Sequence, residues 1–246
     1  MTILGYYNNV MENYVKVLLD ALKKENIEPT ETMLAQFELY YNYLIDYNQN
    51  VNLTAITEKA DVYVKHFADC VLGSHIYKKD ASLCDIGTGA GFPGVVLKII
   101  RPDLNVTLVD SLNKRIVFLD NLIAKLNLRG IKALHHRAED VEFKNNYLNL
   151  FDYVVARAVA NLTTLTEYCL PYVKIGGSFV AYKSIDAGTE LLEAKKCISV
   201  LGGGYKDTLS YNLQDATRNL IVINKIKPTS NTYPRGLNKP KLRPIK

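Results

Sequence analysis

Three glycines at alternate positions, Gly87, Gly89 and Gly91, mark the stretch of this sequence best suited to bind a ligand. They follow the short apolar run 83–86 and precede a second apolar run, 95–100, which together predict a strand, a tight turn and a helix. Without Cβ atoms, such a turn lets a bound molecule approach the backbone, and the first N–H groups of the helix are expected to point toward it. The alternative is an ordinary connection that binds nothing.

Acidic residues follow two further predicted strands. Asp110 comes directly after the strand predicted over 105–109 and lies 19 residues beyond Gly91, the separation expected of an acid that binds ribose hydroxyls. Capping of the next helix is the alternative role for Asp110. After the strand predicted over 131–135 come Ala138 and Glu139, where a small residue leaves room for an adenine ring and an acid can accept its amino hydrogens. These residues predict a nucleoside site.

Basic residues gather at the same predicted edge of the sheet. Arg157 follows the strand predicted over 151–156, and Lys183 ends the strand predicted over 178–183. Lys114 and Arg115 begin a helix, where the helix dipole disfavours cations. We expect these four side chains to line one basic mouth that receives an anion. A structural salt bridge is the alternative for Arg157, and a solvated helix face is the alternative for Lys114 and Arg115.

Strands and helices alternate from residue 82 onward. Besides the segments above, the pattern predicts helices over 113–126, 162–169 and 189–201, and two final strands over 204–211 and 219–225 that form an antiparallel pair. This order predicts an α/β fold of the Rossmann-like kind, with a doubly wound, mostly parallel sheet and an antiparallel last strand.

The residues before the sheet are predicted to be helical. Leu34, Phe37, Tyr41 and Leu44 recur at helical spacing, with Thr30 placed as an N-cap, and a further helical segment is expected over 58–77. We divide the chain into a helical cap over 1–78 that packs on the core, a Rossmann-like domain over 79–227, and a tail over 228–246. The tail is too rich in proline and basic residues for regular structure.

The composition limits the classes of protein to which this chain can belong. The chain has 246 residues, of which 48% are hydrophobic and 22% charged, enough for a large core. It has no apolar run near the roughly 18 residues that span a bilayer and no signal-like start, so we expect a cytoplasmic protein without membrane contact. The four cysteines form no CxxC pair, and no metal site is predicted. Residues 216–246 hold eight Lys and Arg and no acid, which suggests either a solubilising tail or a polyanionic partner.

The segment Gly89–Gly94 also satisfies GxGxxG, the dinucleotide fingerprint. Asp85, the extra Gly87 and the antiparallel strand pair favour S-adenosylmethionine instead. An NAD-dependent oxidoreductase therefore stays open as a second hypothesis, and a catalytically silent RNA-binding module as a third.

Several motifs in order resemble the RsmG (formerly GidB) family, the bacterial small-subunit ribosomal RNA guanine-N(7)-methyltransferases. The matching stretches are Asn52-Leu53-Thr54, Lys65-His66, 85–94, 110–115, Ala138-Glu139, Arg157-Ala158 and Tyr233-Pro234-Arg235. The sequence departs from the family at Cys70, where serine is usual, and at Asn238, where glycine is usual. Asparagine tolerates the left-handed conformation, so the turn at Asn238 is expected to survive.

The resemblance implies methyl transfer from S-adenosylmethionine to guanosine 527 of 16S ribosomal RNA, with S-adenosylhomocysteine as product. It makes Gly87, Phe92, Ala138, Glu139 and Arg157 cofactor contacts, to which the residue patterns add Gly89, Gly91 and Asp110. We expect a monomer that acts on 16S rRNA or the small ribosomal subunit. The expected RNA contacts are Lys114, Arg115, Lys183, Arg235, Lys239, Lys241 and Arg243.

Guanine ring nitrogen 7 has a free lone pair and loses no proton on methylation. Transfer to it needs alignment and exclusion of water rather than a general base. We therefore expect no catalytic base, with Arg157 and Lys183 as candidates for positioning the substrate. An exocyclic-amine methyltransferase would carry an Asn/Asp-Pro-Pro-aromatic motif after the fourth strand, where this chain has Ala156-Arg157-Ala158.

Overall fold

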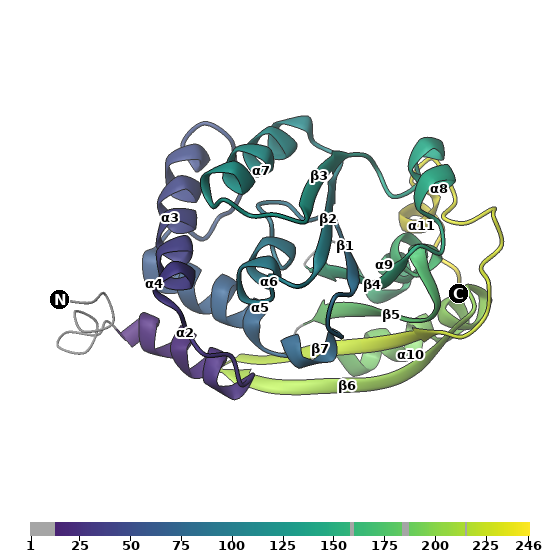
Figure 1. Cartoon of the computed structure of the whole chain (residues 1–246). Helices are drawn as coiled ribbons and strands as arrows, with labels where there is room; N and C mark the ends of the chain where they lie inside the picture. Colours follow the sequence, from purple (N-terminus) through teal and green to yellow (C-terminus); the bar gives the residue numbers. More distant parts are fainter. Residues whose placement is uncertain (1–12, 158–159, 184–186, 215) are drawn as a thin grey trace.

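A computed structural model describes residues 13–157, 160–183, 187–214 and 216–246. Seven strands form one sheet in the order β3-β2-β1-β4-β5-β7-β6, with helices on both faces (Figure 1). The pairs β1–β2, β1–β4, β2–β3 and β4–β5 are parallel, whereas β7 runs antiparallel to β5 and β6. This confirms the predicted doubly wound sheet with an antiparallel last strand. The first twelve residues of the predicted cap and Ala158 lie outside the described ranges.

The predicted strands and helices all appear, and two differences are informative. β5 starts at Val173 rather than at residue 178. Its first half contains two glycines and exposed residues, so the sequence there has no strand pattern. The pairing of this half with β4 also shifts register between Phe151 and Tyr153. A short helix over 141–147 was not predicted, since Phe143 is its one buried residue. The elements are β1 Ser82–Ile86, α6 Gly94–Ile100, β2 Asn105–Asp110, α7 Asn113–Lys125, β3 Ile131–His135, α8 Val141–Tyr147, β4 Phe151–Arg157, α9 Leu162–Cys169, β5 Val173–Lys183, α10 Ala187–Val200, β6 Gly203–Leu213, β7 Ala216–Lys225 and α11 Lys239–Leu242.

Successive residues of the central strands enter different hydrophobic cores. Val155 joins a core with residues of α6, α7 and the N-terminal helices. Val154 joins a second core with residues of α8, α9 and α10. This alternation follows from the two-residue period of a strand, and it buries both faces of the sheet.

The N-terminal third is helical as predicted, with α2 Asn13–Lys24, α3 Glu31–Asn48, α4 Lys59–Val62, a π-helical turn Tyr63–Ala68 and α5 Asp69–Val71. Thr30 caps α3, since its hydroxyl accepts the N–H of Met33 at 3.1 Å. Tyr41 is partly buried against the core, and Tyr40 is the tyrosine of α3 that is fully buried. One detail of the prediction is wrong, because the helix expected over 58–77 ends before Gly73, which has φ of +85°. No helix within the described ranges is long and apolar enough to cross a bilayer.

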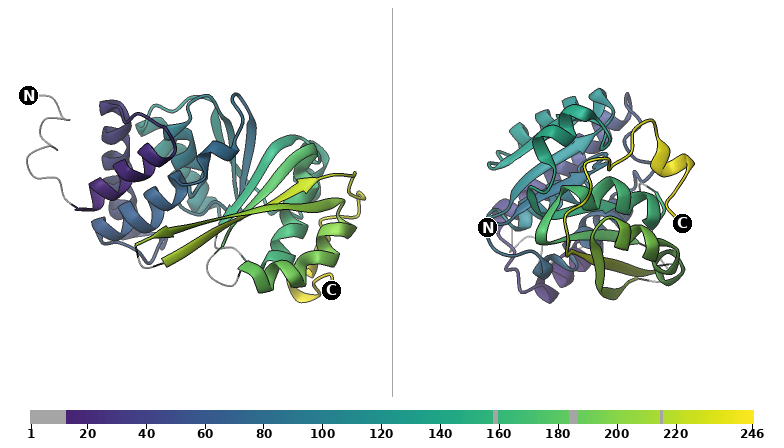
Figure 2. Two further views of the ribbon diagram at one scale, coloured as in Figure 1. Left: turned by 90° about the horizontal axis from the view of Figure 1, so that it is seen from below. Right: turned by 90° about the vertical axis from the view of Figure 1, so that its right-hand side faces the viewer.

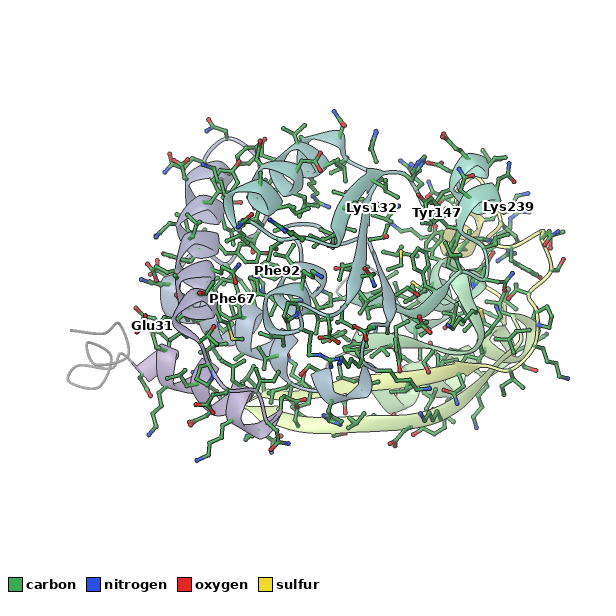
Figure 3. All side chains as sticks on the ribbon, viewed as in Figure 1. Glu31, Phe67, Phe92, Lys132, Tyr147 and Lys239 are labelled. Atoms are coloured by element: carbon green, nitrogen blue, oxygen red, sulfur yellow. The ribbon has the colours of Figure 1, made fainter. Side chains whose placement is uncertain are left out.

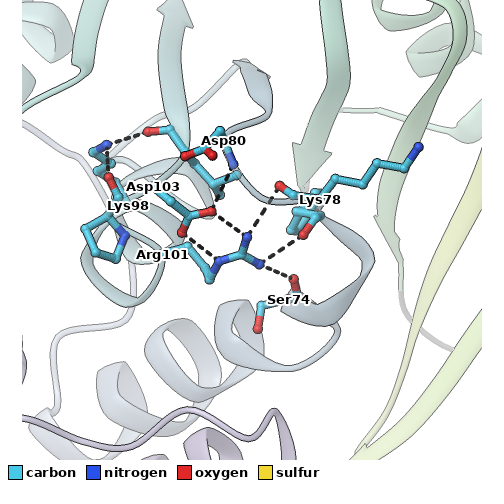
Figure 4. A network of polar contacts seen from close by, with 9 residues as sticks. Ser74, Lys78, Asp80, Lys98, Arg101 and Asp103 are labelled. Atoms are coloured by element: carbon cyan, nitrogen blue, oxygen red, sulfur yellow. Dashed lines mark hydrogen bonds and ion pairs between the residues drawn. The ribbon is translucent and has the colours of Figure 1, made fainter.

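A fork of hydrogen bonds from Arg101 holds the end of this helical region against the core (Figure 4). Arg101 donates to both carboxylate oxygens of Asp103, at 2.8 and 2.7 Å, and to the carbonyls of Ser74, Tyr77 and Lys78. The hydrogen bonds from Arg101 lower the pKa of Asp103 to about 2. β6 and β7 extend as a long ribbon toward the N-terminal helices (Figure 2).

Candidate active site

Hydrogen bonds to the second strand hold the glycine turn between β1 and α6. Gly87 and Thr88 donate their N–H groups to the carbonyl of Val109, at 2.8 and 3.1 Å. Gly89 donates its N–H to Oδ2 of Asp110 at 3.0 Å. Gly87 and Gly89 have φ of +74° and +61°, the region that favours glycine. A Cβ at Gly89 would meet no heavy atom within 4 Å, so the space above its backbone is open.

The N-terminus of α6 presents no free N–H groups at Gly94 and Val95, contrary to the sequence prediction. Gly94 donates its N–H to Oδ2 of Asp85 at 2.8 Å, and Val95 donates its N–H to the carbonyl of Gly91 at 2.8 Å. The Asp85 carboxylate thus accepts the hydrogen bond that the prediction assigned to a ligand. Ligand contacts at this turn must come from the loop before the helix.

Asp85 is a fully buried carboxylate beneath the glycine turn. Burial raises its pKa to about 6, although hydrogen bonds from Thr88 and Gly94 favour the charged form. Its other oxygen, Oδ1, accepts no hydrogen bond from the described residues.

Asp85→Asn is expected to change how stability depends on pH. A raised folded-state pKa means that the contribution of Asp85 is fully present below about pH 3.8 and is lost as pH rises through about 6. Asparagine does not ionise, so the variant should gain on the order of 2–3 kcal/mol relative to the unmodified chain between about pH 4 and pH 7. Urea unfolding of both proteins across this range measures the difference. A difference independent of pH would contradict the prediction.

A pocket of about 340 Å³ opens at the carboxyl ends of β1, β2 and β3. We call it the β1–β3 pocket, and its volume is within the range of small-molecule sites. The structure brings four of the predicted cofactor residues together there. Its lining residues are Ile86, Gly87, Val109, Asp110, Ser111, Arg115, His136, Arg137, Ala138, Glu139, Tyr168 and Asn238.

Asp110 both shapes the turn and lines this pocket. Its Oδ1 accepts the N–H of Leu112 at 3.0 Å, just before α7, so the capping alternative is partly realised. Its Oδ2 accepts Gly89 N–H and Nη1 of Arg115, the latter at 3.1 Å. A carboxylate has roughly four acceptor positions. These three donors leave room for one more hydrogen bond from a ligand.

Arg115 lies in the β1–β3 pocket rather than on an RNA-facing rim. Its Nε is buried and has no hydrogen-bond partner among the described residues. A buried donor without a partner is costly, so this atom indicates an acceptor supplied from outside the chain. Its neighbour Lys114 is exposed.

Gly91 and Phe92 contact the N-terminal helices and do not line either pocket described here. A Cβ at Gly91 would lie 2.6 Å from Val95 and 2.8 Å from the hydroxyl of Tyr40. The Phe92 ring stacks between Tyr40 and His66, with centroids 5.3 and 4.4 Å away. Figure 3 shows Phe92 near Phe67 of the π-helical turn. Close packing of the helices is what requires a glycine at position 91.

A second pocket, of about 330 Å³, lies where β4 and β5 end and β7 begins. We call it the β4–β7 pocket. It contains the predicted Arg157 and Lys183 together with residues that sequence reasoning did not select. Its lining residues are Ile56, Lys65, His66, Asp69, Arg157, Tyr182, Lys183, Tyr211, Arg218 and Asn219.

Asp69 is the centre of this second pocket and is 5% exposed. Its carboxylate accepts hydrogen bonds from Nη1 of Arg157 at 3.0 Å and from the hydroxyl of Tyr211 at 3.2 Å. It also pairs with Arg218 at 3.4 Å. The salt bridge proposed as an alternative for Arg157 is therefore present, and it joins the N-terminal helices to β4, β6 and β7.

Nδ1 of His66 has two polar neighbours of opposite kind. Nη2 of Arg157, a donor, lies 2.9 Å away, and the carbonyl oxygen of Lys65, an acceptor, lies 3.1 Å away. The other ring nitrogen, Nε2, lies 3.1 Å from the hydroxyl of Thr54. Burial and the charge of Arg157 lower the pKa of His66 to about 3, so the ring is neutral at neutral pH.

The four cations predicted to share one mouth lie in separate places, so that prediction is wrong. Arg115 lines the β1–β3 pocket, Arg157 and Lys183 line the β4–β7 pocket, and Lys114 lies outside both sets of lining residues. The strand order explains this separation, because α7 follows β2 on one side of β1 while β4 and β5 lie on the other. Lys183 is paired with Glu190 at 2.7 Å.

The tail is more ordered than predicted. It contains the short helix α11, and the prediction of no regular structure is wrong because Pro240 occupies the first turn, where proline is tolerated. Asn238 adopts φ of +54°, so the expected left-handed turn is present. Of the four predicted RNA contacts in the tail, Arg235 is paired with Glu167 at 2.6 Å. The side chains of Lys239, Lys241 and Arg243 are exposed.

Sequence reasoning did not select Asp69, Tyr211 or Arg218 for the site. They are far apart along the chain, since Tyr211 follows Asp69 by 142 positions. One feature of the sequence could have indicated Asp69. It is a charged residue inside an apolar helical segment, between Phe67-Ala68 and Cys70-Val71.

The strand order and the antiparallel last strand define the Rossmann-like fold of S-adenosylmethionine-dependent methyltransferases. Solved structures with a similar fold include M. jannaschii TYW2 in complex with AdoMet, with a TM-score of 0.51 and 14% identity over 62% of this chain and 73% of that chain. Another is a mutant of the 16S rRNA (adenine(1408)-N(1))-methyltransferase from Catenulisporales acidiphilia, with a TM-score of 0.51, 14% identity, and coverage of 62% and 88%.

Residues 33–221 match the profile of the family described as rRNA small subunit methyltransferase G. The chain is 46% identical to ribosomal RNA small subunit methyltransferase G of Lactobacillus helveticus, covering 95% of this chain and 99% of that protein. The protein of the same name from Staphylococcus aureus (strain bovine RF122 / ET3-1) is 47% identical, with coverage of 94% and 98%. This chain belongs to that family and is a methyltransferase. The family assignment displaces the oxidoreductase hypothesis.

Proposed function

We propose that this chain transfers a methyl group from S-adenosylmethionine to ring nitrogen 7 of a guanine in 16S ribosomal RNA, position 527 by family resemblance. The observation that supports this most is the pair of pockets at one edge of the sheet. The β1–β3 pocket has the acids Asp110 and Glu139 in its lining, and the β4–β7 pocket has four cations around Asp69. One of these cations, Arg157, lies 5.1 Å from the ring centroid of Phe92, which directly follows the glycine turn.

The β1–β3 pocket fits the cofactor. Gly87 lines it, the space above the backbone of Gly89 is open, Asp110 has an acceptor position for a ribose hydroxyl, and Nε of Arg115 lacks a partner among the described residues. Ala138 and Glu139 suit the adenine. Gly91 and Phe92 support the turn from behind, and Arg157 borders the methyl-donor end. When bound, S-adenosylmethionine supplies a methyl group activated by a sulfonium. Among the described residues, no cluster of three His, Cys, Asp or Glu is placed to hold a metal.

The β4–β7 pocket suits the acceptor base and its flanking phosphates. Arg157 and Lys183 orient the base there, and the exposed Lys114, Lys239, Lys241 and Arg243 contact RNA outside the pocket. Lys183 lines the pocket and is also paired with Glu190. Arg235 and Arg115 are paired with Glu167 and Asp110, and they position these carboxylates. We further propose that the protein acts as a monomer in the cytoplasm.

The methyl-transfer rate at saturating cofactor and RNA is expected to be nearly flat between about pH 7 and pH 9. His66 is neutral above about pH 3, so its ring does not titrate in this range. Asp85 is ionised above about pH 6, and burial raises the pKa of Cys70 to about 12. Single-turnover rates across this range measure the profile. A rise with unit slope would show that a proton leaves before transfer and would contradict nitrogen 7 as the acceptor.

The deciding experiment uses ribosomal RNA and small subunits from cells that lack this protein. The purified chain is incubated with labelled S-adenosylmethionine and each substrate, and the modified base is mapped. We expect 7-methylguanine at one position of 16S rRNA. Methylation of another atom would contradict the assignment, and RNA binding without transfer would favour the silent binding module.

A further inference from the structure

The C-terminal segment Tyr233–Lys246, here called the tail segment, is docked on the face of the core that carries α8 and α9 (Figure 1). The carbonyl of Pro234 accepts a hydrogen bond from Nζ of Lys144 at 3.2 Å. The carbonyl of Pro240 accepts one from the hydroxyl of Thr164 at 3.2 Å. The tail segment is therefore attached at both ends of its turn.

A buried ion pair forms the strongest of these attachments. Arg235 donates its backbone N–H, Nε and Nη2 to the carboxylate of Glu167, at 3.0, 2.7 and 2.6 Å. Glu167 is 1% exposed. Bidentate pairs of this kind fix geometry, and loss of one partner leaves a costly buried charge. Arg235 thus acts as a latch rather than as a free cation for RNA.

The latch brings the tail turn to the β1–β3 pocket. Leu237 and Asn238 have φ of +60° and +54°, and Asn238 is one of the residues that line the pocket. Tyr168, which directly follows Glu167 on α9, lines it too. The residue that holds the tail and a residue of the pocket wall are thus neighbours on one helix.

We propose that the tail segment forms one wall of the site for the adenosyl part of the cofactor, with the backbone turn at Leu237 and Asn238 as the contacting surface. The turn shares the pocket with Asp110, Ala138 and Glu139, the residues suited to a ribose and an adenine. This inference rests on the proposed assignment of that pocket to the cofactor. It gives the tail a role in cofactor binding that is separate from contacts with RNA phosphates.

Calorimetric titration of the full chain with S-adenosylhomocysteine and with 5′-methylthioadenosine tests the proposal without measuring activity. Arg235→Ala releases the latch, so both ligands should bind about tenfold more weakly. The matched control is Lys239→Ala combined with Lys241→Ala, which removes two exposed charges of the tail and leaves the latch in place. Its affinity for both ligands should equal that of the unmodified chain.

A second pair of variants tests the turn itself. A β-branched residue is strained at positive φ whereas glycine is not, so Asn238→Val should weaken both ligands several-fold more than Asn238→Gly. Unchanged affinity in Arg235→Ala, or a loss confined to S-adenosylhomocysteine, would overturn the assignment of the tail to the adenosyl part. A loss in the lysine double variant would overturn the latch. Absence of binding by the unmodified chain would overturn the proposed function as well.

Discussion

Arg157→Lys is expected to lower the single-turnover rate of methyl transfer by about 100-fold although the charge is kept. The guanidinium donates at once to Asp69, to the carbonyl of Lys65 and to His66. It also lies over the ring of Phe92. An ammonium lacks the planar fork that makes these contacts together. Loss of about two charge-assisted hydrogen bonds, at the lower value of roughly 1.5 kcal/mol each, raises the barrier by about 3 kcal/mol and gives this magnitude.

The measurement uses saturating cofactor and RNA, so that binding losses do not enter the rate. Arg129→Lys is the matched control, because Arg129 is an exposed arginine outside both pockets. A rate for Arg157→Lys equal to that of the control would show that Arg157 only holds the N-terminal helices in place. Reduced stability with an unchanged rate would lead to the same conclusion.

The parallel sheet could be predicted because each strand is indicated by a pattern of adjacent residues. The segments 105–109, 131–135 and 151–156 are short stretches in which apolar residues predominate, and each became a strand within one residue of the expected bounds. Thr30 capped α3 as expected because a cap depends on a few adjacent residues. The first half of β5 escaped prediction because glycines and exposed residues interrupt its pattern.

Contacts between distant segments could not be predicted from the sequence. Asp69 binds Arg157, which is 88 residues away, and nothing in the spacing of the two indicates that they meet. The same holds for Arg235 and Glu167, which are 68 residues apart. A sequence shows that a cation follows a strand, but its partner depends on which elements pack around that strand end. This is why the four expected cations separated into different environments.

The glycine turn illustrates a prediction that was right in location and wrong in one physical detail. Open backbone at Gly89 agrees with the expected close approach of a ligand. The N–H of Gly94 at the start of α6, however, is used by Asp85, a side chain of the preceding strand. An acid inside an apolar strand competes for the donors that a ligand would otherwise use, and its burial raises its pKa.

Gly89→Val is expected to abolish detectable cofactor binding, a loss of about 100-fold or more, while the protein stays folded. Position 89 has φ of +61° and no heavy atom within 4 Å of a Cβ, so the added methyl groups would enter the space above the turn without striking the core. They would occupy volume that the cofactor needs. Positive φ at a β-branched residue costs about 1–3 kcal/mol, and this cost must be separated from the loss of binding.

Gly176→Val provides that separation. Gly176 has φ of +85° and likewise nothing within 4 Å of a Cβ, but it lies in the exposed first half of β5. Gly89, by contrast, donates its N–H to Asp110, which lines the β1–β3 pocket. Both variants should lose similar stability in thermal unfolding, because both place valine at a strained position in open space. Calorimetry with S-adenosylhomocysteine should then show normal affinity for Gly176→Val and none for Gly89→Val. Equal affinity in the two folded variants would remove the glycine turn from the cofactor site, because the methyl groups at position 89 would then occupy space that no ligand uses.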